Sequence, residues 1–228
     1  MRKIAVFDLD HTLLDTDLLF NVDLRTALAR FAPQTDEIWD QSTREAVRDE
    51  YSLERHIRAL VACCERGAFS EEKCRADLAR EFANLQRYLY EDVERNLVRA
   101  KNCGWELALL SFGNPPWQNH KVVGSGLARW FGDKVFFTAT HGTKADVLAQ
   151  EFADCQNLMF VDNRGPELDR VQEKMPHVAT YHICRVPPEM SAGKTPEGAL
   201  RYLEARAIEA MGSACNHIRC TTLDSLSL

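Results

Sequence analysis

The sequence lacks the features that mark a membrane protein or a nucleic-acid-binding protein. Its 228 residues contain no apolar run long enough to cross a bilayer. The formal net charge is −6, so neither nucleic acid nor an anionic membrane is expected as the main partner. Internal repeats and low-complexity segments are also absent. With 45% hydrophobic and 27% charged residues, the composition is that of a soluble globular protein.

Features of a secreted protein are missing as well. The eight cysteines include no CxxC pair, and the start of the chain resembles a signal peptide only superficially, because aspartates at 8, 10, 15 and 17 interrupt its apolar stretch. We therefore predict a cytoplasmic protein with reduced, mostly buried thiols. The tail from Cys215 to Cys220, which includes His217, has no matching second pair of zinc ligands, so ordinary packing is the better interpretation there.

The hydrophobic pattern changes once along the chain. Residues 17–103 contain one proline, one glycine and no period-two run, which predicts helices only. Their expected ranges are 17–30, a segment starting at 36, a segment from 52 to before 67, 70–88 and 91–102. Elsewhere apolar strands alternate with helices. Strands are expected at 3–7, 105–111, 134–139, 157–161 and 179–183, and helices at 117–130, 144–152, 167–174 and 196–211. This alternation predicts an α/β fold, a parallel sheet with helices on both faces.

Two carboxylates follow the first strand directly. Asp8 and Asp10 come after the buried run Lys3 to Phe7, where packing gives no reason for an acid. Crowded carboxylates at the end of a buried strand indicate a bound cation or a shared proton, although a solvated turn capped by Asp10 and Thr12 is the alternative.

Three more polar residues follow later strands. Ser111, Lys144 and Asp162 come after the second, third and fourth predicted strands. In a parallel sheet these positions meet at the carboxyl edge, where α/β proteins bind ligands. Each residue alone is an ordinary turn or surface residue, but together they predict an active site.

These motifs resemble those of the haloacid dehalogenase-like hydrolases. Asp8 to Thr12 matches the family's DxDxT motif, and Ser111, Lys144 and Asp162 match its second, third and fourth motifs. The resemblance implies a Rossmann-like three-layer core over residues 1–15 and 89–228. It also implies an inserted all-α cap over residues 16–88.

The resemblance further implies a Mg²⁺-dependent phosphatase. Asp8 would attack phosphorus to form an aspartyl-phosphate, and Asp10 would be the general acid and base. Lys144 would offset charge at the nucleophile and phosphate. The resemblance also implies that the phosphate is bound by Thr12, Ser111 and Phe112. It implies that Mg²⁺ is bound by Asp8, Asp162, Asn163 and the main-chain carbonyl of Asp10.

One position departs from the family pattern, and several functions stay open. The family usually has a second acid where this chain has Asn163, and Glu167 is the candidate substitute. The expected substrate is a small phosphorylated metabolite. A phosphomutase would use the same residues, and a weakly active phosphate-sensing or interaction protein is a further alternative. A dehalogenase would need neither Asp10 nor a metal. The oligomeric state is not predicted.

The predicted cap carries an arginine stripe. Between residues 34 and 65 there is neither proline nor glycine, which permits one long helix or two nearly collinear ones. Arg44, Arg48, Arg55 and Arg58 would then lie within a sector of about 80°. A solvated face is the default interpretation, and a contact with an anionic part of the substrate is the functional one.

Overall fold

Strand β1 (Lys3–Phe7) lies at the centre of a parallel sheet. The computed structural model describes residues 2–31, 35–46, 51–63, 70–140, 142–185 and 215–228. Within these residues the strand order is β3-β2-β1-β4-β5-β6. The bounds of the other strands are as follows: β2 Trp105–Phe112, β3 Val135–Thr138, β4 Asn157–Asp162, β5 Ala179–Ile183 and β6 Ile218–Cys220.

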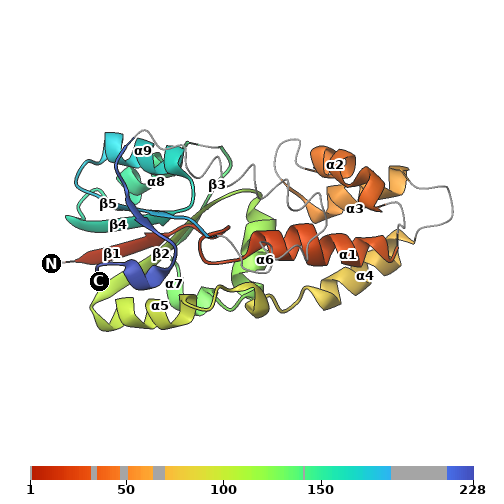
Figure 1. The fold of residues 1–228 in the computed structure, drawn as a ribbon, viewed down its shortest axis with the longest axis horizontal. Coiled ribbons are helices and arrows are strands. Elements are labelled where there is room, and N and C mark those ends of the chain that lie inside the picture. The colour runs from red at the N-terminus through yellow and green to blue at the C-terminus, as the bar shows by residue number, and fades with distance from the viewer. Residues whose placement is uncertain (1, 32–34, 47–50, 64–69, 141, 186–214) are drawn as a thin grey trace.

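Helices cover both faces of the sheet (Figure 1). One face carries α8 (Lys144–Glu151) and α9 (Gly165–Lys174), and the other carries α5 (Val93–Asn102) and α7 (Ala128–Phe131). Alternate residues of β1 divide between these layers, since Ile4 and Val6 belong to one apolar core while Ala5 and Phe7 belong to the other. The apolar residues of β1, from Ile4 to Phe7, are therefore buried on both faces of the sheet, which confirms the predicted three-layer α/β fold.

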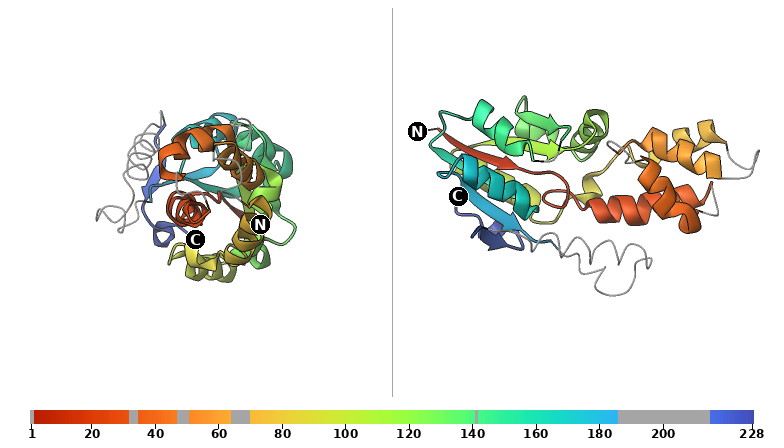
Figure 2. Two further views of the ribbon diagram at one scale, coloured as in Figure 1. Left: turned by 90° about the vertical axis from the view of Figure 1, so that its right-hand side faces the viewer. Right: turned by 90° about the horizontal axis from the view of Figure 1, so that it is seen from above.

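A second group of helices lies beyond the carboxyl edge of the sheet (Figures 1 and 2). It contains the π-helical turn η1 (Leu18–Leu24), α1 (Arg25–Ala29), α2 (Thr35–Ala46), α3 (Leu53–Cys63) and α4 (Glu71–Glu81). A short 3-10 turn, η2 (Gln86–Tyr88), precedes the return to the sheet. This arrangement is compatible with a cap inserted between the first two strands.

The two connections to these helices pair with each other. The amide of Asp15 donates to the carbonyl of Tyr88 at 2.7 Å, and the amide of Tyr90 donates to the carbonyl of Leu13 at 3.2 Å. An isolated β-bridge joins Leu14 to Leu89. The chain therefore leaves and re-enters the sheet layer through one hydrogen-bonded double linker.

The prediction of one long or two collinear helices between residues 34 and 65 is wrong. Helix α2 ends at Ala46, α3 begins at Leu53, and the two pack side by side (Figure 1). Arg44 is exposed, and exposed Arg58 pairs with Glu54 at 2.5 Å. Reversal of the chain between the helices removes the continuous stripe, and Arg48 lies outside the described residues.

Other elements differ in detail from expectation. Helix α4 ends at Glu81, although the predicted helix ran to residue 88, and the expected helix at 117–130 divides into α6 (Pro115–Gly124) and α7. Strand β6 was not predicted, and the 3-10 turn η3 (Leu223–Ser225) follows it. The predicted helix at 196–211 lies outside the described residues. No helix within the described ranges is both long and apolar enough to span a bilayer.

The cysteine-rich tail forms this last strand. Cys220 is buried opposite Ile183 in β5, and the His217 ring lies 2.8 Å from both Thr180 Oγ1 and Asp169 Oδ1. Side-chain packing and hydrogen bonding thus hold this segment against β5.

Candidate active site

Strand register brings the first and fourth motifs together. Phe7 of β1 is level with Val161 of β4, so the next residues, Asp8 and Asp162, emerge side by side. Both are almost fully buried, and the amide of Asp8 donates to the carbonyl of Val161 at 2.9 Å. Two buried carboxylates at one sheet edge need a positive partner.

Lys144 supplies that partner. It is the first residue of α8, and its Nζ donates to Asp8 Oδ1 at 2.6 Å and to Asp162 Oδ2 at 2.7 Å. Although burial opposes the charged amine, Asp162 and Asp8 outweigh it and raise the pKa of Lys144 above its ordinary value. The lysine therefore stays protonated between the two acids.

Crowding also affects the nucleophile candidate. Burial raises the pKa of Asp8 to about 7, with Lys144 opposing the rise and the charges on Asp162 and Asp10 adding to it. A divalent cation beside Asp8 would relieve this repulsion. The carboxylates of Asp8 and Asp162 are hard oxygen donors of the kind that Mg²⁺ prefers, so the donor type fits this ion.

The acidic set is nevertheless small. In the described part of the chain, no three His, Cys, Asp or Glu side chains converge as a metal cluster. The main-chain oxygen of Asn163 accepts a hydrogen bond from His182 Nε2 at 3.0 Å, which braces the loop after β4. Glu167 Oε1 accepts from the amide of Gly142 at 2.8 Å, so this acid supports the loop that precedes Lys144. Its Oε2 is buried and has no hydrogen-bond partner within the described residues.

A tight turn carries Asp10 and Thr12. The carbonyl of Leu9 accepts from the amides of Leu13 and Leu14 at 2.9 and 3.0 Å. His11 adopts a left-handed φ of 62° inside this turn. Thr12 is fully buried, and its main-chain oxygen accepts from Arg185. These contacts agree with a bracing role for Thr12, whereas its predicted contact with phosphate stays a prediction.

The second motif ends β2. Ser111 is buried there, and Phe112 is the last residue of the strand. The side chain of Asn114 accepts from the amide of Trp117 at 3.2 Å and caps α6, while Pro115 and Pro116 start its first turn. Helix α6 therefore begins directly beside the candidate phosphate-binding serine.

Helix α6 also holds Asp10, which the sequence did not reveal. Lys121 Nζ lies 2.5 Å from Asp10 Oδ1, and Gln118 Nε2 donates to Asp10 Oδ2 at 2.9 Å. Burial acts to raise the pKa of Asp10, but Lys121, assisted by His11 and Thr16, holds that pKa below its ordinary value. Polar residues at 118 and 121, one helical turn apart directly after the serine motif, were the available signal.

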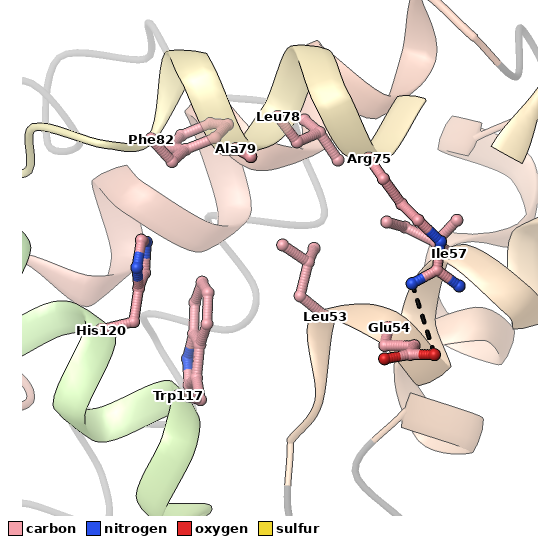
Figure 3. Close-up of a pocket in the computed structure, with 9 residues that line it drawn as sticks. All are labelled: Leu53, Glu54, Ile57, Arg75, Leu78, Ala79, Phe82, Trp117 and His120. Carbon is pink, nitrogen blue, oxygen red and sulfur yellow. Dashed lines mark ion pairs between the residues drawn. The ribbon is translucent and has the colours of Figure 1, made fainter. Parts of the chain in front are cut away.

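A cavity of about 300 Å³ lies between α6 and the helices α3 and α4 (Figure 3). Trp117 and His120 of α6 face Leu53 of α3 and Phe82, the residue directly after α4. The Glu54–Arg75 ion pair, at 3.3 Å, lies at the opposite end. At 100° per residue, Trp117 and His120 lie roughly 100° around the helix from the residues that contact Asp10. The cavity is therefore a neighbour of the candidate site across α6.

Comparisons with known proteins agree with this arrangement. Residues 2–162 match the haloacid dehalogenase-like hydrolases, and no curated protein matches the sequence. A Burkholderia xenovorans protein described as a haloacid dehalogenase-like hydrolase is 17% identical, with a TM-score of 0.68 over 98% of this chain and 94% of that one.

Two further solved structures share the fold. The L-2-haloacid dehalogenase from Xanthobacter autotrophicus with chloropropionic acid covalently bound is 17% identical, with a TM-score of 0.62 over 98% of this chain and 96% of that one. A Thermotoga maritima protein described as a β-phosphoglucomutase is 13% identical, with a TM-score of 0.55 over 88% of this chain and 91% of that one. The match over residues 2–162 and the site geometry lead to one conclusion: the chain belongs to the haloacid dehalogenase-like hydrolases.

Proposed function

We propose that the protein is a Mg²⁺-dependent phosphatase acting on a small phosphorylated metabolite. The observation that carries this proposal is Asp10, whose carboxylate is held at the same sheet edge as Asp8. An alkoxide leaving a phosphate ester needs a proton, and the water that follows must lose one. A halide leaves without a proton, so the first of these needs is absent in dehalogenation.

The nucleophilic step belongs to Asp8. Its carboxylate oxygen forms a bond to phosphorus as the bond between phosphorus and the leaving oxygen breaks, and Asp10 gives that oxygen a proton. Asp10 must take up this proton when substrate binds, because Lys121 holds its pKa low in the free protein. Water then attacks the aspartyl-phosphate, Asp10 takes the proton from water, and Asp8 is regenerated with release of inorganic phosphate. Ser111 would bind a phosphoryl oxygen, and Lys144 would offset negative charge on Asp8 and on the phosphate.

Mg²⁺ would be held by Asp8 and Asp162, with the main-chain oxygen of Asp10 and the side chain of Asn163 or Glu167 as further candidate donors. When bound, the ion supplies charge that lets an anionic nucleophile approach an anionic phosphate. Support comes from the oxygen donors and from the raised pKa of Asp8.

A dehalogenase is the second candidate, because several structural neighbours are described as L-2-haloacid dehalogenases. A phosphomutase stays open on the same residues. One experiment separates the three activities. Purified protein is assayed with p-nitrophenyl phosphate and a metabolite panel for phosphate, with 2-chloropropionate for chloride, and with hexose phosphates for isomerised product.

Phosphate release that requires Mg²⁺ and stops in EDTA is the expected result. Chloride release without phosphate release would assign a dehalogenase. Isomerisation of a hexose phosphate that exceeds its hydrolysis would assign a phosphomutase. Activity that survives thorough chelation would contradict the metal requirement.

A further inference from the structure

Lys121 is a buried charge that the proposed chemistry does not use directly. Its side chain is 3% exposed. Among the described residues, the Lys121 amine has one hydrogen-bond partner, Asp10 Oδ1, at 2.5 Å. A buried lysine is costly to desolvate, and its position beside the proposed acid and base calls for an explanation.

Three protein groups donate to the Asp10 carboxylate. Oδ1 accepts from Lys121 Nζ and from Thr16 Oγ1, each at 2.5 Å, and Oδ2 accepts from Gln118 Nε2 at 2.9 Å. A carboxylate oxygen has about two acceptor positions. Within the described residues both positions of Oδ1 are used, whereas Oδ2 retains one. Oδ2 is therefore the oxygen that can exchange a proton with substrate or water.

Gln118 also reaches the phosphate side of the site. Its Nε2 lies 3.2 Å from Ser111 Oγ and donates to the carbonyl of Phe112. Gly113 makes room for it, because a Cβ at Gly113 would lie 2.6 Å from Gln118 Nε2. The backbone of Gly113, with a φ of 135°, likewise favours glycine. The glutamine is thus built into the link between Ser111 and Asp10.

We propose that Lys121 and Gln118 are positioning residues that fix the Asp10 carboxylate and present Oδ2 to the reacting oxygen. The inference rests on the proposed phosphatase function. Lys121 and Thr16 hold Oδ1, and Gln118 orients Oδ2 relative to Ser111. When water attacks the aspartyl-phosphate, its proton passes to Oδ2, a bond forms between phosphorus and the water oxygen, and the bond to Asp8 breaks.

The principal test replaces Lys121 with methionine, which keeps the length of the side chain but removes the donor. With p-nitrophenyl phosphate, whose leaving group departs without a proton, Lys121→Met should lower kcat at least 30-fold and change KM less than threefold. Because hydrolysis of the intermediate slows, the fraction of enzyme carrying phosphate on Asp8 after an acid quench should rise severalfold by mass spectrometry. Lys121→Arg, which keeps a donor, should recover activity to within tenfold of wild type.

Two further variants separate the loss of Asp10 positioning from a general effect of removing a lysine. Gly113→Ala should displace Gln118 and lower kcat in the same direction. Lys174→Met removes a half-exposed lysine paired with Asp146 and should leave kcat unchanged. Thermal unfolding of every variant identifies any that fail to fold.

A crystal structure of Lys121→Met gives a readout that does not depend on turnover. The Asp10 side chain should leave the position in which it contacts Gln118. An unmoved Asp10, or a kcat within twofold of wild type with no gain in phosphoenzyme, overturns the inference. A rise in KM alone would also overturn it, because it would assign Lys121 to substrate binding. Wild-type protein that releases no phosphate counts against the proposed function, and the position of Asp10 in Lys121→Met then still tests whether Lys121 positions it.

Discussion

The buried ion pair between Arg185 and Asp92 offers a quantitative test of how the turn after Asp10 is held. Arg185 Nη1 lies 3.0 Å from Asp92 Oδ1, and both side chains are at most 5% exposed. Arg185 Nε donates to the carbonyl of Thr12 at 2.8 Å, and its guanidinium lies 4.1 Å from the centre of the Tyr90 ring. Asp92 Oδ2 in turn accepts from the amide of Leu223 at 2.6 Å. One arginine therefore joins the turn that carries Asp10 and Thr12, the returning linker and the C-terminal segment.

Arg185→Met should lower the free energy of unfolding by about 3–5 kcal/mol, because it leaves the buried Asp92 carboxylate without its cation. For a chain of this size, a loss of that amount lowers Tm by roughly 6–20 °C. The measurement is urea unfolding at 25 °C and pH 7, followed by tryptophan fluorescence. The double variant Arg185→Met/Asp92→Asn should regain much of the loss, since it removes both charges.

An exposed pair of the same residue types provides the control. Arg95 and Asp224 also form a close Arg–Asp contact, but their side chains are 56% and 47% exposed. Arg95→Met should lower stability far less than Arg185→Met, because water solvates the carboxylate left behind. The reasoning fails if Arg185→Met costs no more than Arg95→Met.

Four other predictions follow from the site and the helices beyond it. Asp8→Asn should abolish turnover and phosphoenzyme together, whereas Asp10→Asn should slow dephosphorylation so that phosphoenzyme accumulates; phosphate located elsewhere by mass spectrometry would refute these roles. Asn163→Asp should tighten Mg²⁺ binding in calorimetry, and unchanged affinity would place Asn163 away from the ion. Burial lowers the pKa of His56 to about 4, below its ordinary value of about 6.5 in an unfolded chain. As the pH falls from about 6.5 to about 4, only the unfolded state therefore binds this proton. Stability should decline by about 3 kcal/mol over that interval for this group, and His56→Gln should lose that part of the slope in urea titrations; equal slopes would contradict the burial argument. Arg58→Ala should change KM and kcat by less than twofold, because Arg58 is an exposed partner of the neighbouring Glu54. A selective rise in KM for a metabolite would instead assign Arg58 to substrate binding.

The sequence by itself determined strands β1 to β5 and the acidic centre of the site. Strands β1, β2 and β4 are local, mostly apolar runs, and Asp8, Ser111 and Asp162 each occur at or directly after the end of one. Because parallel strands present their carboxyl ends at one edge, three local signals were enough to predict a meeting of residues far apart in the chain. The structure places Lys144 between Asp8 and Asp162, as charge balance at that edge would require.

Only the tertiary structure decided which partners these residues have. A polar residue on a helix looks the same in sequence whether it faces water or a buried acid, so Lys121 and Gln118 became visible only when α6 was docked against Asp10. The same holds for Arg185, whose partners lie 93 and 173 positions away. Strand β6 has three residues and depends on pairing with β5, and the reversal between α2 and α3 depends on their apolar faces packing together. Local propensity fixes where elements form, whereas long-range packing fixes which faces meet.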